Sequence, residues 1–89
     1  MTHVKLILKR PTKKLAPRES DILTLLAYGN TRDAISNILS LSEETVKDYI
    51  ARACRKLGAV NKTNAIAIAI AFGLITPRKE RYRPTNSNK

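Results

Sequence analysis

The clearest alternation of apolar and polar positions lies in residues 42–58, which read SEETVKDYIARACRKLG. At about 100° per residue, the apolar positions fall on one side of a helix and most charged positions on the other. The apolar side contains Val46, Ile50, Ala53, Cys54 and Leu57. Ser42 can cap the amino end and Gly58 can end the helix, so an amphipathic helix is expected over residues 43–57. Taken alone, this segment equally fits a solvated helix of a bundle.

A second periodic segment, LAPRESDILTLLAYGN, covers residues 15–30. Pro17 suits the first position of a helix, and Gly29 with Asn30 suits its end. Ala16 occupies the capping position without an acceptor, which should cost about 1 kcal/mol relative to Ser or Thr. The expected buried positions are Leu15, Ile22, Leu23, Leu25 and Leu26.

A third segment, TRDAISNILS, begins at Thr31, which can cap a short helix. Its expected buried positions are Ile35, Ile38 and Leu39. Only Ser40 and Leu41 separate this helix from the cap at Ser42. Such a short connection predicts a sharp turn between two helices, the helix-turn-helix arrangement, in which the second helix enters the DNA major groove.

In the last apolar segment, isoleucine alternates with alanine in NAIAIAIAF, residues 64–72. The period alone suggests a strand, but the high helix propensity of alanine favours a helix from about Thr63 to Phe72. This helix would be apolar nearly all round, and a small domain covers only part of such a surface. We expect a symmetric dimer through Ile66, Ala69 and Ile70, with packing of all faces inside one chain as the alternative.

The distribution of charge defines three parts of the chain. With 89 residues and a net charge of +10, the protein is one small domain suited to a polyanionic partner. Residues 15–75 hold seven basic and six acidic side chains, so nine of the ten net positive charges lie in residues 1–14 and 76–89. We therefore predict a basic linker or arm over 1–14, a folded domain over 15–75, and a basic polar tail over 76–89. Both arms are expected to be flexible, and both could contact phosphates.

The residues do not favour catalysis or a resident metal. His3 and Cys54 are single residues of their types and lack the convergent partners that a metal site or a nucleophile pair needs. No acid/base pair or phosphate-binding glycine loop is evident, so neither an enzyme nor a cofactor is expected. One cysteine makes no internal disulfide, and no apolar run spans a bilayer, which favours a cytoplasmic protein without a membrane partner.

The motifs occur in the order LAPRE, a glycine turn, AISNILSLSEETVKDYI, RKLGAVNKT and GLI. This order resembles the LuxR-type, or GerE-like, helix-turn-helix domain over about residues 15–75. Thr45, Val46 and Lys47 match the TVK signature of its recognition helix. The RKLGAVNKT segment is more similar to the quorum-sensing branch than to the response-regulator branch. Ala16 and Ser36 depart from the family, which usually has threonine and a close-packed alanine there.

The resemblance implies an all-α domain of four helices that binds DNA as a homodimer and recruits or blocks RNA polymerase. Family members often read bases from the positions of Lys47, Asp48 and Ala51. Lysine or arginine can bond guanine O6 and N7, Asp48 can accept from cytosine N4, and the Ala51 methyl can contact a thymine methyl. The complete set of expected DNA-binding residues is Thr31, Ser42, Glu44, Thr45, Lys47, Asp48, Tyr49, Ala51, Arg52, Arg55, Lys62 and Thr63. For Thr31, Ser42 and Thr63 helix capping is an alternative role.

Two other functions stay open on the sequence. An interaction module that pairs with a regulator through the Ile/Ala helix and inhibits it would associate tightly with that regulator and bind DNA weakly. An RNA-binding helical protein would prefer RNA to duplex DNA. The chain has no room for a small-molecule domain, so we expect either a domain of a longer regulator or a free one.

Overall fold

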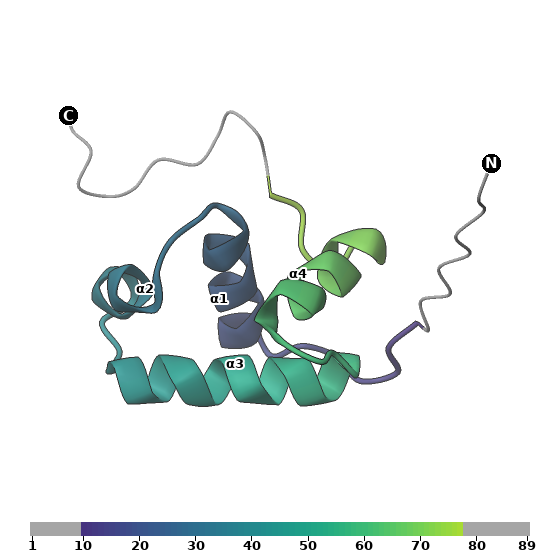
Figure 1. Ribbon diagram of the computed structural model, residues 1–89, viewed down its shortest axis with the longest axis horizontal. Helices are drawn as coiled ribbons and strands as arrows, with labels where there is room; N and C mark the ends of the chain where they lie inside the picture. Colours follow the sequence, from purple (N-terminus) through teal and green to yellow (C-terminus); the bar gives the residue numbers. More distant parts are fainter. Residues whose placement is uncertain (1–9, 78–89) are drawn as a thin grey trace.

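The computed structural model describes residues 10–77, and four α-helices lie within this range. They are α1 (Pro17–Ala27), α2 (Arg32–Leu39), α3 (Glu43–Leu57) and α4 (Lys62–Ala71). In Figure 1, α3 lies along the base, with α2 above one end, α1 above its middle and α4 above the other end. The predicted helices and the all-α fold are confirmed. Residues 1–9 and 78–89, most of the two predicted arms, lie outside the described residues.

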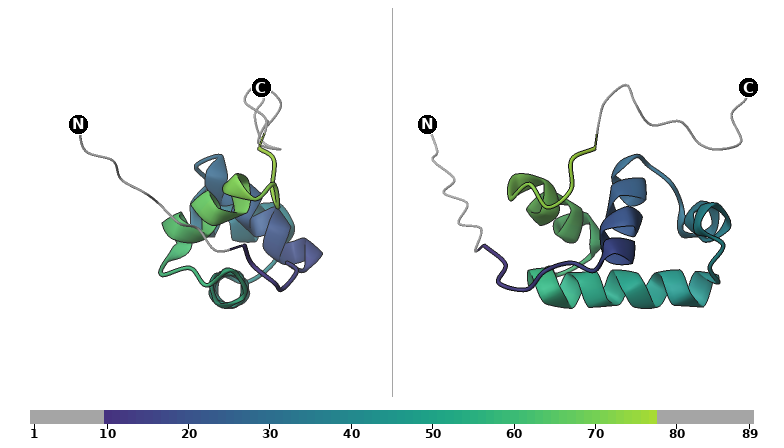
Figure 2. Two further views of the ribbon diagram at one scale, coloured as in Figure 1. Left: turned by 90° about the vertical axis from the view of Figure 1, so that its right-hand side faces the viewer. Right: turned by 180° about the vertical axis from the view of Figure 1, so that it is seen from behind.

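Helices α1 and α3 form the centre of the domain. They contact each other, and each also contacts α2 and α4, whereas α2 and α4 do not contact each other. The core accordingly has two parts. One joins α1, α3 and α4 around Leu23, Leu57 and Ile68, and the other joins α1, α2 and α3 around Ile35 and Val46. The views in Figure 2 show the same arrangement from the side and from behind. The buried stripe predicted for residues 43–57 is confirmed, and it fixes which side of α3 faces outward.

The predicted caps of α2 and α3 are confirmed. The Thr31 hydroxyl accepts from the Ala34 amide at 3.1 Å, and the Ser42 hydroxyl accepts from the Thr45 amide at 3.0 Å. Gly58 ends α3 with a φ of 67°, a left-handed conformation that glycine adopts without a steric penalty. The ends of the expected reading helix are therefore set by its own sequence.

The cap of α4 differs from the prediction. Asn61 is the capping residue, and its side-chain oxygen accepts from the Asn64 amide at 2.8 Å. The Asn64 side-chain oxygen in turn accepts from the Val60 amide at 3.0 Å. These two bonds start the helix at Lys62, because asparagine is as good an N-cap as serine. Thr63 thus lies inside the first turn, and the prediction that it caps the helix is wrong.

Two serines, one inside α2 and one at its end, occupy unusual positions. Ser40 has a φ of 56°, the left-handed conformation that ends α2 and turns the chain toward α3. Ser36 is 7% exposed, and its hydroxyl donates to the Asp33 carbonyl at 2.8 Å. A buried hydroxyl that is hydrogen-bonded carries little penalty, so Ser36 fits where the family usually packs alanine.

Candidate nucleic-acid interface

One side of α3 is open to solvent along its whole length. Opposite it, Val46, Ala53 and Leu57 are at most 4% exposed and hold α3 on the core. The open side, here called the reading face, consists of six exposed residues: Glu44, Lys47, Asp48, Ala51, Arg52 and Arg55. All six belong to the predicted set of DNA-binding residues. The face offers cationic donors, carboxylate acceptors and one methyl group, which are the chemical groups that distinguish base edges.

Arg52 has a defined neighbour at the edge of the reading face. Its guanidinium lies 5.3 Å from the centre of the Tyr49 ring, and Tyr49 itself is half-buried against the α1–α2–α3 core. This cation–π contact restricts the arginine before any ligand binds. Lys47 and Arg55 make no ion pair within residues 10–77, where the salt bridges are Arg18–Asp21, Arg32–Glu43 and Lys56–Glu19. Both cations are therefore available for an external anion or a base edge.

Two hydroxyls mark the amino end of α3. Besides accepting from the Thr45 amide, the Ser42 hydroxyl donates to Thr45 Oγ1 at 2.8 Å. The Ser42 proton is thereby used, whereas the Thr45 hydroxyl still has a proton to donate. Of this pair, Thr45 is the better donor to a phosphate, and Ser42 acts mainly as the cap.

The remaining predicted contacts lie on other helices. Thr31 caps α2, while Lys62 and Thr63 lie in the first turn of α4, and all three are exposed. The structure does not bring them onto the reading face. Each lies at a helix amino end, where free amides and the helix dipole favour an anion.

An ion pair that the sequence analysis missed fixes the carboxyl end of α3. The Lys56 ammonium donates to Glu19 Oε1 at 2.8 Å, and the same oxygen accepts from the Ala16 amide at 2.8 Å. The Glu19 side chain is 2% exposed and that of Lys56 is 30% exposed. Because 37 residues separate the two, the sequence showed only an acid in a first turn and a cation in a last turn.

The environment of Glu19 favours its charged form. Burial alone raises the pKa of a carboxyl group, because it removes water from the charge. The hydrogen bonds from Lys56 and Ala16, together with the positive charges of Lys56 and Arg52, outweigh that effect and lower the pKa of Glu19 below its ordinary value of 4.5. Glu19 therefore stays ionised and holds α3 against α1.

The predicted dimer surface on α4 needs a correction. Ala69 is 0% exposed and belongs to the core shared by α1, α3 and α4, so its side chain cannot contact a second chain. Ile66 is half-buried against the same core. Ile70 is 48% exposed, and Val60, in the loop before α4, is 85% exposed. Of the three predicted residues, Ile70 alone is exposed.

Comparison with known proteins decides what this arrangement is. The family of bacterial regulatory proteins named luxR matches residues 13–69, which is most of the described domain. The chain belongs to the LuxR family. It is thus a LuxR-type helix-turn-helix DNA-binding domain, and the LuxR family is one of transcriptional regulators and not of enzymes. The resemblance seen in the sequence is confirmed.

Two similar proteins are transcriptional regulators that are much longer than this chain. The chain is 39% identical over 67 residues to the transcriptional activator protein BjaR1 of Bradyrhizobium diazoefficiens, covering 75% of this chain and 28% of the relative. It is 48% identical over 62 residues to the quorum sensing-dependent transcriptional regulator RpaR of Rhodopseudomonas palustris, covering 70% of this chain and 26% of the relative. The chain therefore spans about a quarter of the length of these relatives.

Solved structures show the same fold. The transcription factor GerE superposes with a TM-score of 0.67 at 32% identity, covering 70% of this chain and 92% of that one. A complex of Vibrio cholerae VqmA with ligand and DNA superposes with a TM-score of 0.64 at 32% identity, covering 92% of this chain and 35% of that one. Within residues 10–77 no helix is long and apolar enough to cross a membrane.

Proposed function

We propose that this LuxR-family domain binds double-stranded DNA sequence-specifically, with α3 in the major groove, as part of a quorum-sensing regulator. The observation that carries the proposal is the reading face, an exposed row of mixed donors and acceptors opposite a fully buried stripe. The relative RpaR is described as quorum sensing-dependent, and BjaR1 as a transcriptional activator. The VqmA structure contains DNA, which supports the same kind of ligand here.

Base recognition is assigned to the middle of α3. Lys47 and Asp48 are exposed on one turn of α3 and Ala51 on the next, and α3 has the diameter that a major groove admits. Lys47 bonds guanine O6 and N7, Asp48 accepts from cytosine N4, and the Ala51 methyl packs on a thymine methyl. The reading face also carries the Glu44 carboxylate. A carboxylate repels a base edge that presents only acceptors, so the acids on this face contribute to discrimination between sequences.

Phosphate contacts are assigned around this centre. The Thr45 hydroxyl, the Arg52 guanidinium beside Tyr49, and the exposed amino ends of α2 and α4 can donate to backbone oxygens. Such contacts fix the register of the helix on DNA without reading bases. Thr31, Lys62 and Thr63 take this role in the proposal.

A homodimer through the exposed part of α4 places two reading faces on one DNA molecule. Ile70 supplies the apolar centre of that contact, since burying its exposed part against a second copy removes apolar surface from water. Two-fold symmetry then predicts two half-sites about one helical turn apart. RNA polymerase is the expected downstream partner in the cytoplasm, and no small-molecule site is assigned to this domain.

The test begins with selection of a binding site from random duplexes by the full 89-residue chain. Lys47→Ala should lower affinity for the selected site by about 1–3 kcal/mol and leave affinity for random DNA nearly unchanged. Lys62→Ala, which removes the same charge away from the reading face, should weaken both by similar factors. Equal losses on selected and random DNA for Lys47→Ala would contradict a base contact, and failure to enrich any sequence would contradict specific binding.

The exposure of Ile70 and Val60 also favours a second candidate, a module that pairs with another regulator and inhibits it. This candidate predicts tight hetero-association together with weak binding of the selected duplexes. Selection of a distinct DNA site by the isolated chain would exclude it as the main function.

A further inference from the structure

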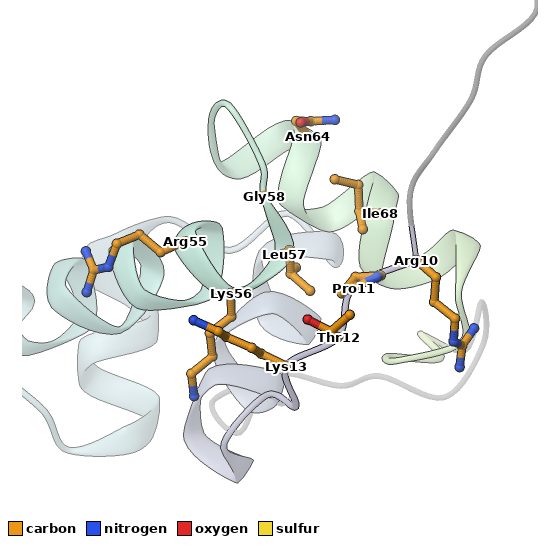
Figure 3. Close-up of a pocket in the computed structure, with 10 residues that line it drawn as sticks. All are labelled: Arg10, Pro11, Thr12, Lys13, Arg55, Lys56, Leu57, Gly58, Asn64 and Ile68. Carbon is orange, nitrogen blue, oxygen red and sulfur yellow. The ribbon is translucent and has the colours of Figure 1, made fainter.

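The segment before α1 forms a groove with the carboxyl end of α3. Residues 10–13, here called the strap, lie beside the end of α3 and beside α4, and they line an open groove of about 540 Å³. Its floor is apolar, formed by Leu57 and Ile68 (Figure 3). Its rim carries four cations, Arg10, Lys13, Arg55 and Lys56, and the ten lining residues include no acid. The sequence had assigned this segment to a basic arm that could contact phosphates, but it had not predicted a groove.

Contacts at the start of the strap and shortly after its end hold it against the domain. At its start, the Arg10 guanidinium lies 5.5 Å from the centre of the Phe72 ring, at the end of α4. Three residues after the strap, the Ala16 amide donates to the buried Glu19 carboxylate. Figure 3 shows the Lys13 side chain extending from the strap toward the last turn of α3. Lys13 is exposed and makes no ion pair within the described part of the chain.

The uncommitted groups in the groove are hydrogen-bond donors. Lys56 is neutralised by Glu19 and Arg10 lies over the Phe72 ring, which leaves Lys13 and Arg55 as the cations without such a partner. The Asn64 side-chain oxygen already accepts from Val60, so its NH₂ group remains to donate, and the Thr12 hydroxyl adds another donor. A set of cations and donors without a competing carboxylate suits a phosphate.

Arg55 connects this groove to the reading face, because it lies on both. From Lys47 to Arg55 the helix advances eight residues, about 12 Å at 1.5 Å per residue. The major groove of B-DNA is about 12 Å wide. When Lys47 lies against the bases, Arg55 and the adjoining strap groove therefore lie at the sugar-phosphate edge.

We propose that the groove between the strap and the carboxyl end of α3 binds a backbone phosphate of DNA through Lys13 and Arg55. The inference rests on the proposed function, since the DNA is the same molecule that the reading face contacts. It adds a contact from outside the helix-turn-helix, and it makes the chain before α1 part of the DNA interface. A free anion such as inorganic phosphate has the same chemistry but lacks the second anchor on the reading face.

The experiment compares Lys13→Ala with Lys14→Ala in the full chain. Both residues are exposed and each substitution removes one positive charge, but Lys14 does not line the groove. Binding to a mixed-sequence duplex is titrated over a range of salt concentrations. Lys13→Ala should reduce the magnitude of the slope of log K against log salt concentration by about 0.9. It should also lower the affinity at moderate salt by roughly three- to tenfold. Lys14→Ala should change the slope by less than half as much.

Equal slopes for the two variants would overturn the proposal, because the cations would then act only as general charge. A second measurement uses the selected site with single phosphates replaced by neutral methylphosphonates. At one flanking position per half-site, the methylphosphonate should abolish the difference in affinity between wild type and Lys13→Ala. If it does so at no position, the groove holds no phosphate of the DNA. If the wild-type chain binds no duplex at all, the proposed function itself fails. In a third measurement, inorganic phosphate is added to wild-type chain and duplex at unchanged ionic strength. If phosphate displaces the duplex and Lys13→Ala does not change the salt slope, the groove binds a free anion, and the DNA contact is contradicted.

Discussion

Lys56 of α3 donates a hydrogen bond of 2.8 Å to Glu19 of α1, and the Glu19 side chain is 2% exposed. The same carboxylate accepts from the amide of Ala16, the residue just before α1. The buried Glu19 carboxylate thus links the amino end of α1 to the carboxyl end of α3. The orientation of α3 therefore depends on a partner of Lys56, Glu19, that lies in α1 and outside the helix-turn-helix motif of α2 and α3.

Replacing Glu19 by glutamine should destabilise the domain by about 1–3 kcal/mol, because the buried acceptor loses its negative charge and the ion pair with Lys56 becomes a weaker hydrogen bond to a neutral group. The cost stays in this range because Lys56, 30% exposed, can turn toward water. Urea unfolding should show a lower midpoint with an unchanged slope. Glu43→Gln is the matched control, since its 3.6 Å pair with Arg32 is half-exposed and should contribute less than about 0.5 kcal/mol. Equal effects of the two substitutions would refute a special role for Glu19.

The lowered pKa of Glu19 predicts a dependence of stability on pH. Since the pKa is lower in the folded chain than in the unfolded one, the stabilisation by the ionised carboxylate is complete above 4.5, its ordinary value. It is lost as the pH falls through the folded-state pKa. The free energy of unfolding of wild type and Glu19→Gln, measured from about pH 7 to about pH 3, should therefore converge at the acid end. A constant difference across this range would show that Glu19 does not titrate as described.

The sequence was sufficient for the helices and for the helix-turn-helix, because both are local properties. The stripe of Val46, Ala53 and Leu57 follows from helix period, and the caps at Thr31 and Ser42 follow from side chains next to the amides they bind. The reading face followed in turn, as the side of α3 opposite the stripe. Local chemistry thus predicted the four helices and the side of α3 that faces outward.

Contacts between distant segments could not be predicted in this way. Glu19 and Lys56 are 37 residues apart, and neither pattern points to the other. Helix α4 is apolar nearly all round, so its period gives no direction of burial, and Ala69 was assigned to a surface although it lies in the core. The strap groove depends on the packing of residues 10–13 against two helices, for which their basic composition gave no signal.

The cap of α1 offers a stabilising substitution. Ala16 has the extended conformation of a capping residue, with φ −70° and ψ 155°, and the Glu19 carboxylate already accepts from its amide. The alanine methyl has no acceptor for the Glu19 amide, so only one half of a capping box exists. Ala16→Ser supplies the missing oxygen and should stabilise the chain by about 0.5–2 kcal/mol. Thermal unfolding measures the gain, with Thr31→Ala as the reverse change at α2; an Ala16→Ser variant no more stable than wild type would contradict this account.

Substitution of Ile70 tests the homodimer apart from the stability of the domain. Ile70 is 48% exposed, so Ile70→Lys should leave the unfolding midpoint of the monomer nearly unchanged. If Ile70 is buried between two copies, each copy loses the burial of about half a side chain, and the two copies together lose about 1.5–3 kcal/mol, which raises the dimer dissociation constant roughly 10- to 150-fold. Sedimentation equilibrium across a concentration series measures that constant for each variant. Val60→Lys is the control, because Val60 is more exposed at 85% but precedes α4, and it should have the smaller effect. If Val60→Lys weakens association as strongly as Ile70→Lys, any exposed apolar side chain suffices and α4 is not the dimer surface.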